Sequence, residues 1–330
     1  MNRLFASVIV ASLSVVFLTQ CSSDSGSRNG AGNASRASAG AAPIRSKTLP
    51  GNPGGLPFEV VFRGRERLAE LERRSRREGW WKMSMADATA AAGMALRGVP
   101  YENFTLEIDD HIEACSVNLE ALDCWTMFEI ALALAQMSKQ RYRPWTPEQL
   151  LREVEYLRYR GGRCDGNYLS RIHYLAEWWV EAERKGVARD ITRQLPGAES
   201  WFKEINAMSS NPSLYRYLRM NPQLLPEKRR LEAYVQNLPV WHVPKERVAA
   251  VEHLLKSGDI VAITTHLRGE HCSHIGLAYR DSSGVLRFLH ASKNHGRVIL
   301  DGRLSDYLNF FSTHAGIMVA RPLERDPTPW

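Results

Sequence analysis

The pattern of apolar residues changes at Ser257-Gly258, and this change constrains the fold more than any other feature of the 330-residue chain. Before it, apolar residues recur at helical spacing in segments rich in strong helix formers. After it, β-branched and apolar runs alternate with short turns. Helices followed by a strand meander predict an α+β domain, with a helical N-terminal half packed on a small antiparallel β-sheet.

The expected helices and strands follow from this division. Helices are predicted at 65–78, 83–96, 124–137, 146–160 and 169–185, and strands at 259–265, 274–280, 285–290, 297–300 and 316–321. The segment at about 186–245 is mixed, with helical stretches at 201–207 and 226–236. It is interpreted as a helical insertion or a substrate-facing wall within a domain that spans 56–325.

The N-terminus has the features of a targeting segment. Arg3 precedes an apolar run from Leu4 to Leu18, which is typical of a signal peptide at 1–20 and is too short for a convincing membrane span. Leu18-Thr19-Gln20-Cys21 resembles a bacterial lipobox, although Gln20 replaces the small residue expected there. We therefore expect lipidation at Cys21, with an ordinary secretory signal cleaved elsewhere as the alternative.

The segment at 21–55 is rich in Ser, Gly, Ala and Asn and predicts a disordered tether. Together with a lipid on Cys21, it predicts an exported lipoprotein, anchored to the bacterial membrane, in the periplasm or cell envelope. The net charge of +7 suits anionic surroundings such as phospholipid or cell-wall polymer. Nucleic acid is not an expected partner, because the basic residues are spread along the chain without a binding motif.

Cys124 is the candidate nucleophile. Asp123 is a good N-cap, so the thiol is predicted in the first turn of a mostly buried helix. Backbone amides and the helix dipole at that position are expected to favour a thiolate. Of the other cysteines, Cys115 and Cys164 could form a disulfide or remain buried thiols, and the sequence does not decide between these.

Two histidines on neighbouring predicted strands complete the arrangement. His274 lies in Ser-His-Ile-Gly and is the candidate general base, and Gly276 leaves room for a close approach. His290 lies in Phe-Leu-His-Ala, one turn later, and could orient His274. A cysteine followed by a distant strand histidine and then a polar residue on the next strand is the order of a papain-like cysteine hydrolase.

These motifs resemble the NlpC/P60 superfamily of papain-like cell-wall hydrolases, and within it the DUF1460 family, which is N-acetylmuramoyl-L-alanine amidase-like. The resemblance covers roughly 59–322 and includes Asp123 to Glu129, Ser170 to Tyr174 and Gly258 to Ile260. Trp125 departs from the small β-branched residue usual beside the nucleophile.

The resemblance implies a papain-like NlpC/P60 fold and cleavage of the amide between the N-acetylmuramoyl lactyl group and L-alanine in small muropeptides or peptidoglycan fragments. It implies a Cys-His-His mechanism with Cys124, His274 and His290, and no cofactor. Arg171 is the expected clamp for a substrate carboxylate, with His173 and Tyr174 beside it.

Three alternatives remain open. A peptidoglycan stem-peptide endopeptidase would use the same fold and the same residues. A non-catalytic wall-binding lipoprotein could retain the fold, although intact Cys124, His274 and His290 argue against it. A zinc site could use His266, His271, Cys272, His274 and His290, but their spacing matches no zinc motif, so no metal is expected.

Overall fold

The computed structural model describes residues 49–326 and 328 of the chain. The predicted signal peptide, the lipidation site Cys21 and most of the predicted tether lie outside the described residues. Within the described part, no helix has both the length and the apolar character needed to cross a membrane.

The α-helices are α1 (Phe58–Val61), α2 (Arg65–Glu78), α3 (Met85–Ala95), α4 (Cys124–Ser138), α5 (Pro147–Arg158), α6 (Leu175–Arg184), α7 (Ala207–Ser210), α8 (Arg216–Met220), α9 (Leu225–Gln236), α10 (Lys245–Val251) and α11 (Leu304–Phe310). The strands are β1 (Phe62–Arg63), β2 (Val117–Asn118), β3 (Ala188–Asp190), β4 (Glu199–Ser200), β5 (Trp241–Pro244), β6 (Ile260–Thr265), β7 (Cys272–Arg280), β8 (Leu286–Ser292), β9 (Arg297–Arg303) and β10 (His314–Pro322). This confirms the α+β character and the five C-terminal strands.

The main sheet is larger than the sequence predicts. It has eight strands in the order β4-β5-β10-β6-β7-β8-β9, with β3 also paired to β10, and every pair in it is antiparallel. Three of these strands, β3 to β5, come from the segment at 186–245. That segment is therefore not purely helical, which corrects the expected helical insertion.

Two predicted helices also begin later than expected. The helix expected at 201–207 is absent there, because Glu199 and Ser200 pair with β5 and the chain stays irregular until α7. The helix expected at 169–185 begins only at Leu175, after a 3₁₀ turn at Tyr168–Ser170.

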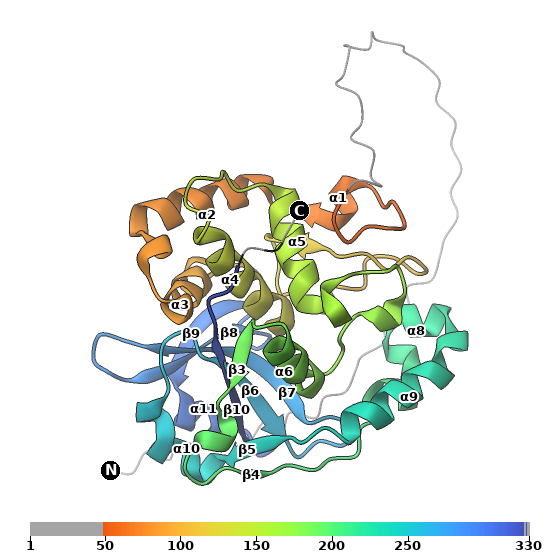
Figure 1. Ribbon diagram of the computed structural model, residues 1–330. Coiled ribbons are helices and arrows are strands. Elements are labelled where there is room, and N and C mark those ends of the chain that lie inside the picture. The colour runs from red at the N-terminus through yellow and green to blue at the C-terminus, as the bar shows by residue number, and fades with distance from the viewer. Residues whose placement is uncertain (1–48, 327, 329–330) are drawn as a thin grey trace, which may run out of the picture. The chain divides into compact units, whose positions relative to one another are not determined.

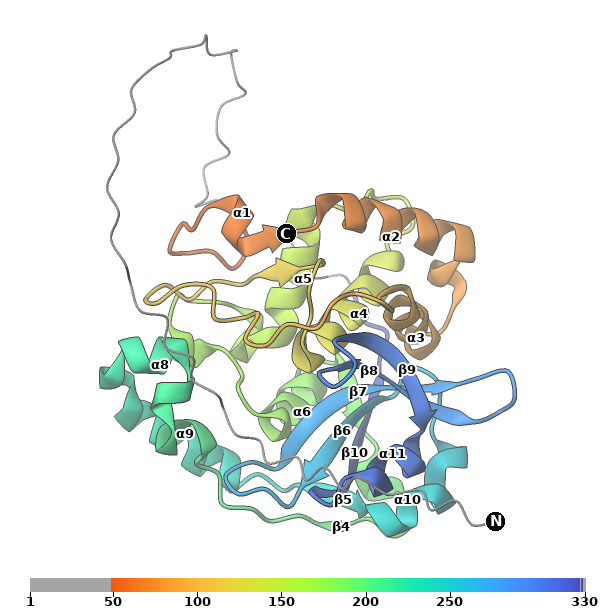
Figure 2. The same ribbon diagram turned by 180° about the vertical axis from the view of Figure 1, so that it is seen from behind.

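Helices cover both faces of the sheet, as Figures 1 and 2 show. Along β6, Ile260 and Ala262 belong to the core shared with α3 and α4. Val261 and Ile263 point to the opposite face and pack with apolar residues of α10 and α11. Burial on both faces explains why β6 is an unbroken apolar run rather than an alternating one. The layer of α4 on β7 and β8 brings the cysteine helix against the histidine strands.

Candidate active site

The start of α4 is fixed by a capping box around Cys124. The Asp123 carboxylate accepts a hydrogen bond from the backbone N–H of Thr126 at 2.8 Å, and the Asp123 N–H donates to the Thr126 hydroxyl at 3.0 Å. These reciprocal bonds satisfy amides that a helix start otherwise leaves unpaired. The predicted N-cap is thereby confirmed, and Cys124 occupies the first position of the helix.

His274 and His290 face each other across β7 and β8. Nε2 of His274 lies 2.7 Å from Nδ1 of His290, and the two ring planes are nearly perpendicular, at 89°. Gly276 permits this approach, because a Cβ atom at that position would lie 2.6 Å from the Leu289 carbonyl oxygen and 2.8 Å from the His290 Cβ. The space beside Gly276 is thus taken by the strand that carries His290.

Asp301 of β9 extends this pair, although no motif in the sequence points to it. Its Oδ2 lies 3.2 Å from Nε2 of His290. The sequence offers little signal for Asp301, because the β8–β9 register pairs His290 with Ile299 and shifts between Arg287 and Leu289. Asp301 therefore reaches His290 diagonally across the strands rather than from a directly opposite position.

The carboxylate of Asp301 sets the positions of the protons on both rings. Its hydrogen bond to His290 holds the pKa of Asp301 below its usual value, so the group is ionised and only accepts. His290 then carries its proton on Nε2, and its Nδ1 accepts the Nε2 proton of His274. The lone pair of His274 is left on Nδ1, which is the ring nitrogen that can act as a base.

The charge state of the site differs from the expected thiolate. Loss of hydration, reinforced by the Asp123 charge, raises the pKa of Cys124 to about 12, against opposing hydrogen bonds from the backbone amides of Ile275, Cys124 and Trp125. Burial, with the nearby His290 and His314, holds the pKa of His274 well below its usual value. Both groups are therefore neutral at rest, since the helix start does not compensate the thiolate for its lost water.

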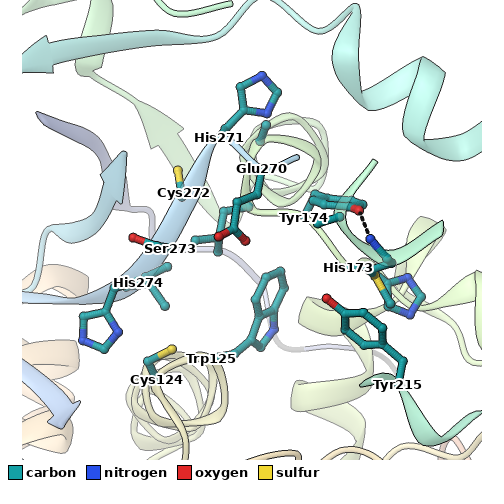
Figure 3. Close-up of a pocket in the computed structure, with 15 residues that line it drawn as sticks. Cys124, Trp125, His173, Tyr174, Tyr215, Glu270, His271, Cys272, Ser273 and His274 are labelled. Carbon is teal, nitrogen blue, oxygen red and sulfur yellow. Dashed lines mark hydrogen bonds between the residues drawn. The ribbon is translucent and has the colours of Figure 1, made fainter. Parts of the chain in front are cut away.

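Cys124 and His274 line one cavity of about 190 Å³, shown in Figure 3. Its walls come from the starts of α4 and α6, from β7 with the residues before it, and from the segment around α7 and α8. The lining residues are Cys124, Trp125, His173, Tyr174, Leu175, Ala176, Ala207, Met208, Tyr215, Glu270, His271, Cys272, Ser273, His274 and Ile275. The segment at 186–245 thus supplies one wall of the cavity, through Ala207, Met208 and Tyr215.

The three predicted substrate-binding residues are placed differently from one another. His173 and Tyr174 line the cavity. The Tyr174 hydroxyl is already engaged, because it donates to Glu232 at 2.6 Å and accepts from the Met208 N–H at 3.3 Å. Only its ring is available to a ligand. Burial, with the neighbouring Lys228, keeps the pKa of His173 well below its usual value, so its ring is neutral.

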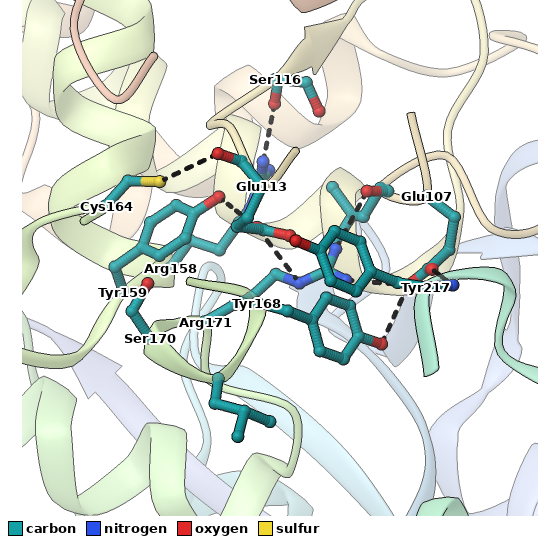
Figure 4. A network of polar contacts seen from close by, with 12 residues as sticks. Glu107, Glu113, Ser116, Arg158, Tyr159, Cys164, Tyr168, Ser170, Arg171 and Tyr217 are labelled. Carbon is teal, nitrogen blue, oxygen red and sulfur yellow. Dashed lines mark hydrogen bonds and ion pairs between the residues drawn. The ribbon is translucent and has the colours of Figure 1, made fainter. Parts of the chain in front are cut away.

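Arg171 lies in a buried network rather than in the cavity wall, as Figure 4 shows. Its guanidinium pairs with Glu107 at 2.8 Å and Glu113 at 3.5 Å, and only 3% of the residue is exposed. Glu107 also accepts from the Tyr217 N–H at 3.0 Å, which ties α8 to the N-terminal half. Two internal carboxylates occupy Arg171, so this geometry gives it a structural role and does not favour the expected substrate clamp.

The described residues contain no group of three or more His, Cys, Asp or Glu side chains placed to hold a metal ion. The cysteines Cys115, Cys124, Cys164 and Cys272 are all free thiols. The thiol of Cys164 donates to the Glu113 carbonyl at 3.8 Å, and that of Cys115 to the Leu151 carbonyl at 3.5 Å. The open question of a Cys115–Cys164 disulfide is thereby answered in favour of buried thiols.

Comparison with known proteins gives one family and several solved structures. The sequence model of the AmiA-like family, described as N-acetylmuramoyl-L-alanine amidase-like, matches residues 91–317. No curated protein sequence matches the chain at a significant level.

Three solved structures illustrate the likeness. An N-acetylmuramoyl-L-alanine amidase from Bacteroides uniformis is 30% identical, with a TM-score of 0.66, over 73% of this chain and 99% of that one. A Bacteroides fragilis protein named as a xylanase by assignment only is 32% identical, with a TM-score of 0.64, over 70% of this chain and 99% of that one. A DUF1460 protein from Legionella pneumophila shares the fold at 20% identity, with a TM-score of 0.58, over 79% of this chain and 97% of that one.

Proposed function

The chain belongs to the N-acetylmuramoyl-L-alanine amidase-like family, and we propose that it is a cysteine hydrolase that cleaves the amide between the muramoyl lactyl group and L-alanine. The observation that carries the proposal is the convergence of Cys124 and His274 on one cavity, with His274 held by His290. A nucleophile, a base and an orienting group are the parts that covalent amide hydrolysis requires. We also propose that the chain is a member of the NlpC/P60 superfamily, and the support is the order of these three residues in the sequence.

The first chemical step begins from the neutral pair. His274 Nδ1 takes the proton from Cys124 as the sulfur attacks the lactyl carbonyl carbon. The tetrahedral oxyanion forms beside the backbone amides of Cys124, Trp125 and Ile275, which already direct hydrogen bonds at the sulfur. The His274 imidazolium then protonates the departing nitrogen, and the peptide leaves with a free L-alanine amino group.

The second step returns the enzyme to its starting state. The muramoyl group is held as a thioester on Cys124, and His274 takes a proton from a water molecule that attacks it. Collapse of this second intermediate breaks the carbon–sulfur bond, reprotonates the sulfur and releases the muramoyl carboxylic acid. Throughout, His290 and Asp301 hold the His274 ring so that Nδ1 faces the reaction.

A stem-peptide endopeptidase is the alternative that the same geometry allows, since Cys124, His274 and His290 do not specify which amide is presented. Xylan hydrolysis is not favoured. Glycosidases ordinarily use two carboxylates that flank the scissile bond. Among the residues that line the described cavity, Glu270 is the one carboxylic acid.

We further propose that the protein works outside the cytoplasm, anchored to the membrane by lipid on Cys21. The support is the sequence alone: a signal-like apolar run, a lipobox-like segment and a Ser/Gly-rich tether. Membrane fractionation of the full chain and of Cys21→Ser tests this proposal. Release of the variant alone into the soluble fraction supports it, and equal fractionation of both proteins contradicts it.

The hydrolase proposal is tested with purified protein and defined muropeptides, by identifying the new amino terminus. L-Alanine identifies an amidase, whereas a D-amino acid or a diamino acid identifies an endopeptidase. Cys124→Ala should lose turnover while remaining folded, and Cys115→Ala, which removes a buried free thiol elsewhere, should keep it. Full activity in Cys124→Ala would refute the proposed nucleophile.

A further inference from the structure

Glu270 is the feature of the cavity that the chemical mechanism does not use. It lies just before β7, four residues ahead of His274, and lines the same cavity as Cys124. Figure 3 shows its side chain extending into the cavity, above Trp125 in that view. A carboxyl group in that position meets whatever part of the substrate lies beyond the reacting amide.

The cavity has no other acidic or strongly basic side chain among its described lining residues. Its three histidines, His173, His271 and His274, all have pKa values that burial lowers, so they are neutral near pH 7. The remaining lining side chains are apolar, aromatic, thiol or hydroxyl groups. Glu270 therefore decides the charge of the cavity.

The Glu270 carboxyl group also lacks an internal partner. Among residues 49–326, none forms a hydrogen bond or an ion pair with it. Lys203 is the cation that most affects it, but the Lys203 ammonium donates to the carbonyl oxygens of Thr265 at 3.1 Å and Leu267 at 2.6 Å. Burial raises the pKa of Glu270 to about 7, against the opposing influence of Lys203. Glu270 is only partly exposed, and a partly desolvated carboxylate without a partner is costly, so a ligand that neutralises it gains affinity.

We propose that Glu270 binds an aliphatic ammonium group of the substrate, with the rings of Trp125 and Tyr215 beside it in the cavity wall. A cation gains from a desolvated carboxylate and from neighbouring aromatic faces, whereas an uncharged donor gains less. The inference rests on the proposed hydrolase function. In a substrate for an amidase, the α-amine of L-alanine is acylated and carries no charge. The ammonium is therefore the side-chain amine of a diamino acid farther along the stem peptide.

The test crosses one enzyme change with one substrate change. Wild type and Glu270→Gln are compared on a muropeptide with a free side-chain amine and on the same muropeptide acetylated at that amine. Loss of a charge-assisted hydrogen bond predicts a KM about 10- to 100-fold higher for Glu270→Gln on the free amine, with kcat within about twofold. On the acetylated substrate the two enzymes should be equal. Glu204→Gln, at an exposed glutamate outside the cavity lining, should match wild type on both.

Equal losses on both muropeptides, or no loss on either, would overturn the inference. A sugar-free stem peptide with a free α-amine supplies the other source of ammonium. If Glu270→Gln weakens only that peptide, the assignment to the diamino acid is wrong. Calorimetric binding to Cys124→Ala, with and without Glu270→Gln, repeats the comparison without turnover. A failure of the inferred ammonium site is then distinguishable from a failure of the hydrolase proposal.

Discussion

Asp301→Asn is the substitution that most sharply probes the proton positions in the site. An asparagine side chain has nearly the same shape, but its NH₂ group can donate to Nε2 of His290. His290 would then hold its proton on Nδ1 and donate it to Nε2 of His274. The His274 proton would move to Nδ1, and the base facing Cys124 would be lost.

The size of the effect follows from the geometry of Asp301. In a Ser-His-Asp triad, the corresponding change to Asn lowers kcat by about 10⁴. Here the carboxylate acts through a second imidazole, over a bond of 3.2 Å, and 28% of the Asp301 side chain is exposed to water that can replace it. A loss of about 10- to 100-fold in kcat, or about 1.4–2.7 kcal/mol, is therefore expected, with KM little changed.

The assay is steady-state kinetics on a defined muropeptide across pH, with thermal unfolding measured on the same preparations. Asp306→Asn, at an exposed aspartate on α11, is the matched control and should behave as wild type. A wild-type kcat in Asp301→Asn would refute the proton assignment. A loss of kcat that is matched by loss of folded protein would also refute it, since a purely structural role predicts that result.

Three further predictions concern the charge state, the packing and the buried network of the site. Because the pKa of His274 is lowered, kcat/KM should fall on the acid side only below pH 6.5. Because the pKa of Cys124 is raised, iodoacetamide should alkylate it slowly below pH 9, and rapid alkylation at pH 6 would indicate a thiolate–imidazolium pair instead. Gly276→Ala places a Cβ atom 2.6 Å from the Leu289 carbonyl oxygen, so it should lower kcat at least about tenfold and lower the free energy of unfolding by about 1–3 kcal/mol. Unchanged kinetics would contradict the close approach of β8. Arg171→Met leaves two buried carboxylates without their cation and should lower the free energy of unfolding by about 3–5 kcal/mol in denaturant, with KM unchanged in the folded fraction. A raised KM without loss of stability would instead support the role of Arg171 as a substrate clamp.

The parts of the fold that sequence could predict are those with a strong local signal. The N-cap at Asp123 and the β-branched run of β6 each mark an element within a few residues, and both were placed correctly. Strands β3 and β4 have two or three residues each and form only because β10 and β5 lie beside them. So short a strand has no periodicity to detect.

The candidate site divides in the same way. Cys124, His274 and His290 stand in recognisable local motifs, whereas Asp301 reaches His290 only through a strand register that shifts partway along. The charge state could not be predicted either. Backbone amides at the helix start favour a thiolate, but the pKa of Cys124 is decided by how much water the cavity removes, which is a property of the whole packing. The internal ion pairs of Arg171 could not be predicted for a similar reason, since its partner Glu107 is distant in sequence and its burial is visible only in the fold.

The mass of the acyl-enzyme shows both which residue is the nucleophile and which amide is cleaved. Protein is quenched in acid during turnover of a muropeptide and digested. The mass of the peptide that contains Cys124 is then measured by mass spectrometry. We expect this cysteine to carry the muramoyl portion as a thioester, and we expect no adduct in Cys124→Ala. An adduct of stem-peptide mass would contradict cleavage at the lactyl–L-alanine amide, and an adduct on another residue would contradict Cys124 as the nucleophile.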